Sequence, residues 1–173
     1  MTQPEGTELQ RLVGRREQLK QTHVRPMKER TTTARGVHHA AFICRDLEET
    51  ILFYTEVLGF PLVELVENPS YPGSSHFFFD LGNRNLLGFF DFPGHPHPGY
   101  EEALGGIHHF AVSFTPDELS AVRQRMDDRG TAYKVMQLGV RPSLHLADPN
   151  GLRLELSQSV PGFIGRTEVV LDS

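Results

Sequence analysis

Two histidines and one glutamate stand at positions where their side chains could bind a divalent metal ion. His39 and His109 occupy the same place in a repeat, because the stretch 36–42 recurs, seventy residues later, as the stretch 106–112. Glu155 lies in an alternating run of polar and apolar residues further along the second copy. Two imidazoles and one carboxylate form the facial triad of metal sites that keep coordination positions open. The pattern therefore predicts that His39, His109 and Glu155 bind a metal such as Fe(II), Mn, Co, Ni or Zn.

Repetition is what favours a metal site over a structural role for these histidines. A single histidine on a strand is more often a hydrogen-bonded structural residue than a ligand. Here the same residue type returns at the equivalent position, with a carboxylate on the same face. The preceding residues, His38 and His108, have the opposite parity and are expected to be packing or strand-end residues.

Each copy of the repeat is followed by one helix and three strands. The first helix is expected to begin at Asp46 and to stop at Gly59, and the second to begin at Thr115 and to stop at Gly130. The strand-like runs are 61–67, 76–81 and 86–92, then 132–137, 143–147 and 152–157. The predicted fold class is therefore α+β, with two βαβββ modules that form a mixed-sheet pseudo-barrel cleft and carry their helices outside.

Strand alternation places the candidate ligands on the faces that line this cleft. Successive side chains point to opposite faces of a strand. On the first strand His39 faces the cleft, while Cys44 faces the helix side as a small core residue rather than a nucleophile. In the second half His109, His145 and Glu155 share the cleft-facing parity.

Four residues are predicted to contact a substrate in the cleft: Phe77, Phe79, Phe90 and Ser143. An apolar wall would suit an aromatic or otherwise apolar small molecule. The run of phenylalanines could instead belong to the hydrophobic core, and both interpretations stay open.

Composition narrows the class of protein. The chain has 173 residues, of which 38% are hydrophobic and 23% charged, as in an ordinary globular protein. Its one cysteine excludes an internal disulfide framework and a Cys-based zinc site, and it suits a reducing cytosol. No apolar run approaches the length of a membrane span, and no signal-peptide core opens the chain. A cytoplasmic protein without membrane contact is expected.

The net charge of −5 divides unevenly along the chain. Residues 1–35 carry eight basic and four acidic residues, whereas the rest carries nine basic and eighteen acidic ones. The acidic body argues against nucleic-acid binding, because it repels phosphates. The expected organisation is a basic N-terminal arm (1–35), a paired-module domain (36–158) and a C-terminal tail (159–173). Within the domain, the first module covers 36–92, a linker 93–105 and the second module 106–158.

Three motifs resemble those of the vicinal oxygen chelate superfamily. They are His39–Asp46, Phe53–Phe60 and Asp148–Glu155. This superfamily contains glyoxalase I, methylmalonyl-CoA epimerase, extradiol catechol dioxygenases, fosfomycin thiol transferases and metal-free bleomycin-binding proteins. The resemblance covers about residues 36–158, and it implies paired βαβββ modules around a divalent metal ion, in agreement with the repeat.

A fourth ligand position distinguishes the branches of this superfamily. Glyoxalase-like members place a Glu, and epimerase-like members a Gln, on the last strand of the first module. The matching position here is Gly88, or Leu86 if the alignment slips by two residues, and neither side chain can bind a metal. Three protein ligands remain, as in extradiol dioxygenases, which use iron, and fosfomycin transferases, which use manganese. The resemblance therefore first implies an Fe(II)-dependent extradiol-type dioxygenase that cleaves a catechol-like ring with dioxygen.

His145 is the candidate catalytic residue. It lies ten residues before Glu155, where dioxygenases of the superfamily use a Tyr or His to hydrogen-bond the substrate hydroxyl. An imidazole there can exchange protons near neutral pH, although it could instead orient Glu155 or Ser143. The same enzymes often carry a catalytic His near the position of Gly88. His76, expected to face solvent, is the nearest substitute.

Other functions stay open. One is a glyoxalase- or epimerase-like lyase or isomerase that stabilises an enediolate on Zn, Ni or Co. Another is a metal-free protein of the same fold that binds an aromatic ligand. A fosfomycin transferase is disfavoured, because apart from Arg166 the groups that would bind a phosphonate are not recognisable. We also expect a homodimer, since this architecture commonly exposes a sheet edge. The modules could pair within one chain or be swapped between chains.

Overall fold

The structure is a computed structural model that describes residues 4–24, 34, 36–96, 99–137 and 142–158. Contacts divide the chain into two units, Met1–Arg35 and Gly36–Ser173. The predicted C-terminal tail, 159–173, and Arg166 within it lie outside the described residues.

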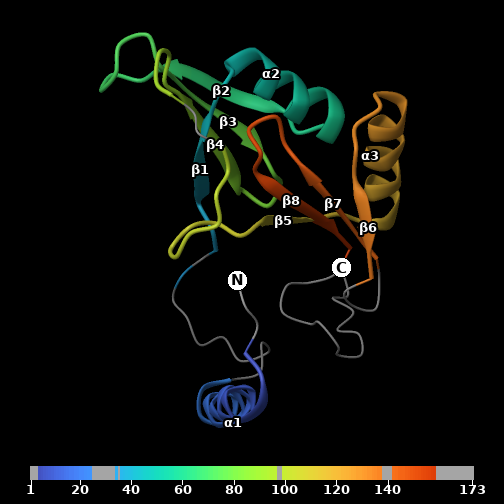
Figure 1. Cartoon of the computed structure of the whole chain (residues 1–173). Coiled ribbons are helices and arrows are strands. Elements are labelled where there is room, and N and C mark those ends of the chain that lie inside the picture. Colours follow the sequence, from blue (N-terminus) through green and yellow to red (C-terminus); the bar gives the residue numbers. More distant parts are fainter. Residues whose placement is uncertain (1–3, 25–33, 35, 97–98, 138–141, 159–173) are drawn as a thin grey trace. The chain divides into compact units, whose positions relative to one another are not determined.

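The first unit contains helix α1, Gly6–His23 (Figure 1). None of the residues of α1 is buried, and Arg11 forms an exposed ion pair with Glu8 at 2.7 Å. The apolar residues Leu9, Leu12 and Leu19 are 46%, 37% and 48% exposed. Of the described helices, none combines the length and the apolar character that a membrane crossing requires.

The second unit begins with a βαβββ module. Strand β1 (His39–Cys44) leads into helix α2 (Leu47–Leu52), which continues as the π-helical segment η1 (Phe53–Leu58). Strands β2 (Leu62–Glu67), β3 (Ser75–Asp80) and β4 (Leu86–Asp91) follow. The sheet order is β1-β4-β3-β2, with β1 parallel to β4 and the other pairs antiparallel.

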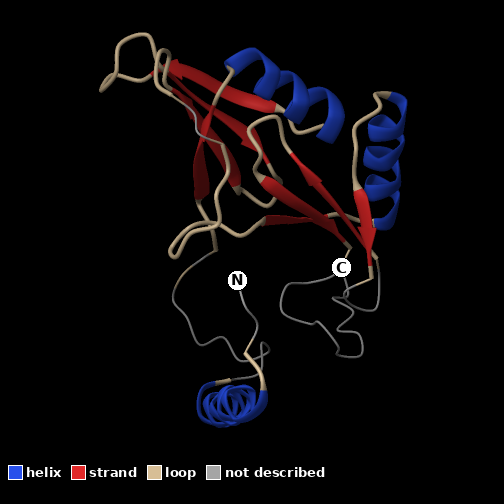
Figure 2. Ribbon diagram, viewed as in Figure 1, coloured by secondary structure: helices blue, strands red, loops and turns tan. Residues whose placement is uncertain are grey.

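The same arrangement returns in the second module. Its elements are β5 (Phe110–Ser113), α3 (Pro116–Asp128), β6 (Lys134–Met136), β7 (Ser143–Ala147) and β8 (Arg153–Ser157). The sheet order is β5-β8-β7-β6, again with the first pair parallel. Two mixed four-stranded sheets with their helices confirm the predicted α+β class and the two βαβββ modules (Figure 2). Both sheets are open.

Helices α2 and α3 begin where side chains satisfy the first backbone N–H groups. Asp46 accepts a hydrogen bond from the backbone N–H of Glu49 at 2.7 Å. Thr115 forms a capping box with Glu118, and Pro116 follows it in the first turn. These contacts confirm the helix starts that the sequence predicts.

Both modules share one hydrophobic core beneath their helices. The fully buried side chains come from β1, η1, α3 and the inner faces of both sheets: Cys44, Tyr54, Phe77, Phe79, Leu87, Phe89, Val122, Met126, Leu154 and Leu156. Cys44 is thereby confirmed as a small core residue, and burial raises the pKa of its thiol to about 11. Such a thiol stays protonated at neutral pH and is a poor nucleophile.

Phe77 and Phe79 belong to this core and not to a substrate-binding face. Both are 0% exposed, and Phe77 is paired across the sheet with Phe89. The Tyr54 ring, on η1, lies 5.0 Å from the rings of Phe79 and Phe89. The prediction that Phe77 and Phe79 contact substrate is therefore wrong, because the helices cover the face of β3 on which they lie.

A buried hydrogen bond connects the two modules. The hydroxyl of Tyr54 donates to Asp148 Oδ2 at 3.0 Å, in the turn between β7 and β8. Asp148 also accepts the backbone N–H groups of Asn150 and Leu152, both at 2.8 Å. The Asn150 side chain in turn accepts the backbone N–H of Arg45 at 2.8 Å. Polar contacts as well as the core therefore join the modules.

Arg125, on α3, caps the end of η1 in the other module. Its Nε and Nη2 donate to the carbonyls of Val57 and Leu58, both at 3.0 Å. Gly59 follows with φ +78°, a left-handed conformation that favours glycine. A Cβ at Gly59 would lie 2.8 Å from Arg125 Nη2.

We expect Gly59→Ala to lower the free energy of unfolding by about 2 kcal/mol or more. A left-handed conformation costs an ordinary residue about 1–2 kcal/mol, and the new methyl group must also displace Arg125. Urea unfolding measures the loss. Gly73→Ala is the matched control, since Gly73 has φ +84° but no atom within 4 Å of an added Cβ. Equal losses in both variants would contradict a role for the Arg125 contact.

Tyr54→Phe should lower the free energy of unfolding by about 1.5–3 kcal/mol, as for other hydrogen bonds to charged groups. Burial raises the pKa of Asp148, and losing the Tyr54 donor raises it further. The loss of stability should therefore be largest above that pKa and should shrink as the pH falls and Asp148 binds a proton. Urea unfolding from about pH 4 to about pH 8 tests this.

The control for Tyr54→Phe is Tyr133→Phe, which removes an exposed hydroxyl that donates to Asp127 at 2.8 Å. An exposed bond of this kind should change stability little. A Tyr54→Phe loss that is equal to the control, or that does not vary with pH, would refute the importance of the buried bond.

Candidate metal centre

Three of the predicted site residues lie side by side on the second sheet. Glu155, on β8, is paired across the sheet with Ala111 on β5 and with His145 on β7. His109 immediately precedes β5, and its Nε2 lies 3.3 Å from Glu155 Oε2. His145 Nε2 lies 4.0 Å from Glu155 Oε1. The side chains of His109, His145 and Glu155 are 40%, 23% and 20% exposed, so solvent reaches the group.

His109 and Glu155 fit a divalent metal ion as a pair of ligands. Imidazole nitrogen and carboxylate oxygen bind zinc at about 2.0–2.2 Å, which places two ligand atoms on one ion about 3 Å apart. The 3.3 Å between His109 Nε2 and Glu155 Oε2 is close to this separation. The two side chains therefore need little movement to bind one ion.

Ser143 is the hydrogen-bond partner of His145. The two side chains lie on the same face of β7, with Ser143 Oγ 2.9 Å from His145 Nε2. Ser143 is buried, at 4% exposed. The serine thus fixes the imidazole, and its predicted contact with substrate stays a prediction.

His39 lies apart from these residues, on the first sheet. Its Nδ1 is 2.8 Å from Nδ1 of His38, and its ring meets the edge of the Phe78 ring with centroids 5.8 Å apart. Within the described residues, no three His, Cys, Asp or Glu side chains stand close enough to hold a metal ion together. One chain therefore groups His109 with Glu155 but does not bring in His39.

Gly88, the position matched to a fourth ligand, lies beneath an aromatic ring. On β4 it is paired with Ala41 on β1 and with Phe78 on β3, so the three residues share the face of His39. A Cβ at Gly88 would lie 2.9 Å from the Phe78 ring. Phe78 therefore fills the space from which a Glu or Gln side chain would extend.

His76 faces the same side of the first sheet as His39, and not solvent as the sequence suggests. Its ring stacks on Phe90 with centroids 3.7 Å apart and lies 4.2 Å from the Phe78 ring. Burial lowers the pKa of His76, and the positive charge of His39 lowers it further. Among the described residues, Nε2 of His76 has no hydrogen-bond partner. A buried imidazole nitrogen without a partner among the described residues thus lies on the His39 side of this sheet.

Sequence reasoning missed Phe78 and His76 as residues of this face, although a signal was present. Alternation along β3 separates the set that contains His76, Phe78 and Asp80 from the set that contains Phe77 and Phe79. The set with two polar members is the one expected to point away from the core. Phe90, the remaining predicted wall residue, pairs with His76 and is partly buried on the His39 face.

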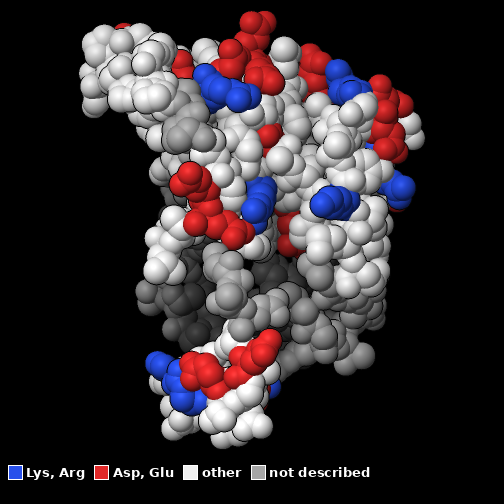
Figure 3. Space-filling view, in the orientation of Figure 1, with Lys and Arg blue, Asp and Glu red and all other residues white. Residues whose placement is uncertain are grey.

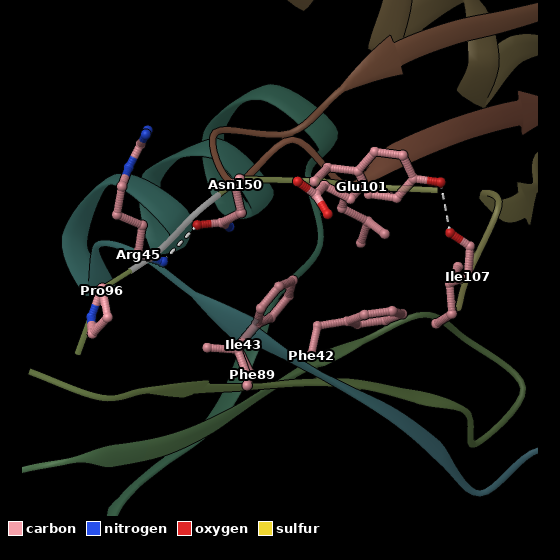
Figure 4. A pocket seen from close by; sticks show the side chains of 11 residues that line it. Phe42, Ile43, Arg45, Phe89, Pro96, Glu101, Ile107 and Asn150 are labelled. Carbon is pink, nitrogen blue, oxygen red and sulfur yellow. Dashed lines mark hydrogen bonds between the residues drawn. The ribbon is translucent and has the colours of Figure 1, made fainter. Parts of the chain in front are cut away.

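A cavity near the linker lies elsewhere in the second unit. This cavity of about 470 Å³ is lined by Phe42, Ile43, Arg45, Phe89, Pro96, Gly99, Tyr100, Glu101, Ile107, Asn150 and Leu152 (Figure 4). The Tyr100 hydroxyl donates to the Ile107 carbonyl at 2.8 Å at one side of it. The lining includes neither the candidate ligands nor His145, so the cavity is not the candidate metal centre.

Acidic and basic side chains are interspersed on the face of the molecule that Figure 3 shows. Some of them form exposed ion pairs, such as Arg129 with Glu56 at 3.0 Å. Exposed pairs of this kind contribute little to stability. On this face they also interrupt the continuous basic surface that phosphate binding would need.

Comparisons with known proteins agree with this architecture. The family model described as "Glyoxalase/Bleomycin resistance protein/Dioxygenase superfamily" matches residues 36–156. Over 128 residues the chain is 31% identical to "Putative ring-cleaving dioxygenase MhqE" of Bacillus subtilis (strain 168). That match covers 71% of this chain and 41% of MhqE, so the chain spans about two fifths of the length of this relative.

Solved structures share the fold. The glyoxylase/bleomycin resistance protein/dioxygenase domain from Frankia sp. EAN1pec has a TM-score of 0.63 at 21% identity, over 72% of this chain and 97% of that one. The fosfomycin resistance protein FosX from Mesorhizobium loti has a TM-score of 0.55 at 19% identity, over 75% and 95%. The family match spans both βαβββ modules, and the chain therefore belongs to the glyoxalase/bleomycin resistance protein/dioxygenase superfamily.

Proposed function

We propose that this protein is an Fe(II)-dependent, extradiol-type dioxygenase that cleaves a catechol-like aromatic ring with dioxygen. His39, His109 and Glu155 bind the metal ion, and His145 takes part in catalysis. The similarity to MhqE, named as a ring-cleaving dioxygenase of putative status, supports this reaction class.

The observation that carries the proposal is the blocked fourth ligand position. Because the Phe78 ring lies over Gly88, a fourth protein ligand has no room to extend from β4 there. Two imidazoles and one carboxylate then leave coordination positions open. When bound, the iron supplies redox chemistry together with positions that substrate and dioxygen can reach.

His145 is placed to move a proton. Its imidazole lies 4.0 Å from Glu155 and is held by the Ser143 hydroxyl at 2.9 Å. A histidine can accept a proton from a substrate hydroxyl near neutral pH and later return it. The Ser143 hydroxyl restrains the orientation of the ring and carries no charge of its own. An uncharged partner suits a ring that has to accept and release a proton.

The first sheet offers an aromatic surface for the substrate ring. Phe78, Phe90 and Ile43 lie on the face of His39, and Ile43 is 59% exposed there. Aromatic side chains contact an aromatic substrate through offset-stacked or edge-to-face arrangements. An aromatic or apolar small molecule therefore suits this face better than a small polar one.

We further propose that a homodimer completes the metal centre, since one chain does not group His39 with His109 and Glu155. Large apolar side chains are exposed on both candidate faces, with Ile43 at 59% on the first sheet and Met136 at 37% on the second. Burying them against a second copy is favourable. Such a dimer brings His39 of one copy to Glu155 of the partner subunit.

A lyase or isomerase is the second candidate, and His76 is the reason to retain it. Its Nε2 is buried and has no hydrogen-bond partner among the described residues, so that a rotation of the ring would be needed before it could abstract a proton next to a carbonyl group. Such a reaction would not consume dioxygen. Fosfomycin chemistry has less support, because the likeness to FosX at 19% identity concerns the fold alone.

Protein purified without oxygen should contain about one iron ion per chain and consume dioxygen with a catechol. Elemental analysis and an oxygen electrode measure both properties. His109→Ala and Glu155→Ala should lose most of the metal, because each removes a ligand. His23→Ala is the control and should keep it, since His23 lies on the exposed helix α1.

The outcomes separate the three candidate functions. Fully iron-loaded protein that stays inert with a broad catechol panel would refute ring cleavage. Turnover of a substrate at an unchanged rate without oxygen would point to the lyase or isomerase. A metal content equal to that of His39→Ala would favour a metal-free binding protein.

Mixing two inactive variants should restore metal binding if the centre lies between subunits. Refolding His39→Ala together with Glu155→Ala gives heterodimers in which one of the two sites has all of its ligands. The mixture should bind Mn(II) at roughly a quarter of the unmodified capacity, while each variant alone binds far less. A mixture no better than its components, or a monomer by light scattering, would contradict the dimeric centre.

A further inference from the structure

A second histidine precedes each candidate histidine ligand, and the two pairs have the same geometry. Nδ1 of His38 lies 2.8 Å from Nδ1 of His39, and Nδ1 of His108 lies 2.8 Å from Nδ1 of His109. The ring centroids are 5.1 Å apart in both pairs, with interplanar angles of 76° and 80°. In each pair one nitrogen must donate and the other accept. His38 and His108 lie just before β1 and β5, in line with the strand-end alternative, and they are also hydrogen-bond partners of the candidate ligands.

In the second module a carboxylate stands at each end of the histidine pair. His108 Nε2 lies 3.7 Å from Glu102 Oε1, and His109 Nε2 lies 3.3 Å from Glu155 Oε2. The order is Glu102, His108, His109, Glu155, with two imidazoles between two carboxylates. Among the described residues, no carboxylate pairs with His38 in the first module, so this arrangement belongs to the second.

Glu102 is held in place by β8, the strand that carries the candidate carboxylate ligand. Arg153, on β8, forms an ion pair with Glu102 Oε1, and its guanidinium lies 4.8 Å from the centroid of the Tyr100 ring. The Tyr100 hydroxyl lies 2.8 Å from the carbonyl oxygen of Ile107 and 3.1 Å from that of His108. Arg153 of β8 therefore contacts the linker at Glu102 and at Tyr100, and Tyr100 in turn contacts the backbone just before His109.

The number of protons limits what the two imidazoles can do. Two neutral imidazoles carry two N–H groups, and the bond between the rings uses one of them. The other can lie on His108 Nε2, facing Glu102, which leaves a lone pair on His109 Nε2. Alternatively it can lie on His109 Nε2, facing Glu155, which leaves a lone pair facing Glu102. Only the first arrangement lets His109 bind a metal through Nε2. Glu102, 3.7 Å from His108 Nε2, favours this arrangement because a carboxylate can only accept, whereas Glu155, 3.3 Å from His109 Nε2, favours the second arrangement as long as no metal ion lies between them.

We propose that Glu102 and His108 are positioning residues, which hold His109 protonated at Nδ1 so that its Nε2 is free to bind a divalent metal ion. This inference rests on the proposed function, in which His109 is a ligand. Partners that fix the tautomer of a ligand histidine typically change metal affinity 10–100-fold when they are removed. Here the carboxylate comes from the linker and acts through a second imidazole, that of His108, at the start of the second module.

The expected loss of metal affinity lies at the lower end of the 10–100-fold range. The side chain of His108 is 72% exposed and that of Glu102 is 39% exposed. Water screens a charge pair at such a position. We therefore expect losses of affinity of about tenfold on removing either residue.

The first measurement is the tautomer of His109 in the metal-free full chain. Nitrogen-15 chemical shifts distinguish protonated from unprotonated imidazole nitrogens, and His109→Gln identifies the His109 signals. The spectra are recorded at about pH 8, well above the ordinary histidine pKa of about 6.5. In the unmodified protein a larger share of His109 should carry its proton on Nδ1 than in Glu102→Ala or His108→Phe. Glu102→Ala and His108→Phe should move it severalfold toward Nε2.

Two variants serve as controls for this measurement. Glu101→Ala removes the same charge from the neighbouring, exposed residue and should leave the His109 tautomer unchanged. His108→Asn places an amide oxygen where it can accept the His109 Nδ1–H, so it should keep more of the Nδ1-protonated form than His108→Phe does. Backbone amide spectra show whether each variant retains the native fold.

The second measurement is the affinity for Mn(II) alone, followed by electron paramagnetic resonance. Glu102→Ala and His108→Phe should raise the dissociation constant about tenfold, and Glu101→Ala should leave it near the unmodified value. Unchanged tautomer and unchanged affinity in Glu102→Ala and His108→Phe would overturn the inference.

Failure of the inference and failure of the proposed function give different results. If the unmodified protein has the Nδ1-protonated His109 but binds no Mn(II), the metal function fails while the tautomer data still support the positioning role. If it binds Mn(II), but Glu102→Ala and His108→Phe have the same His109 tautomer and the same Mn(II) affinity as the unmodified protein, the positioning role fails and the metal function stands.

Discussion

The hydrogen bond between Tyr54 and Asp148 is the constraint on which the arrangement of the two modules depends. A carboxylate in a core must be hydrogen-bonded, and Asp148 receives its donors from Tyr54 of one module and from the turn of the other. If the turn moved away from η1, the buried Tyr54 hydroxyl would lose Asp148 as its acceptor. Since Glu155 follows on the strand that leaves this turn, the same contact fixes the start of the strand that carries a candidate ligand.

Packing both helices over one core determines which faces remain for function. The inner face of each sheet supplies the buried aromatic and aliphatic residues, and the opposite face carries His39 on the first sheet and Glu155 on the second. The faces that carry His39 and Glu155 combine titratable side chains with exposed apolar ones such as Ile43 and Met136. Exposed apolar surface next to chemically useful groups is typical of a site that is completed on binding. A second copy and an aromatic substrate would both cover such surface.

Local patterns predict the fold better than they predict the site. The repeat, the cap at Thr115 and the strand alternation are properties of neighbouring residues, and they predict both modules. Alternation also separates Phe77 from Phe78, but which of them a helix covers depends on contacts between distant segments. The distance from His39 to Glu155 likewise cannot be read from local patterns, because it depends on how the two modules pack against each other. The hydrogen bond within each histidine pair escaped prediction, since parity describes directions and not ring rotations.

The contact between Phe78 and Gly88 also limits how this scaffold could change in evolution. A carboxylate at Gly88 alone would drive its Cβ to 2.9 Å from the Phe78 ring, which overpacks the sheet. A small residue at Phe78 alone would remove the ring that His76 and His39 contact, which leaves a void. Each single change is harmful, yet the pair together could be accommodated, so the two effects are not additive. In this chain, placing a carboxylate at Gly88 would therefore require a compensating change at Phe78 on the neighbouring strand.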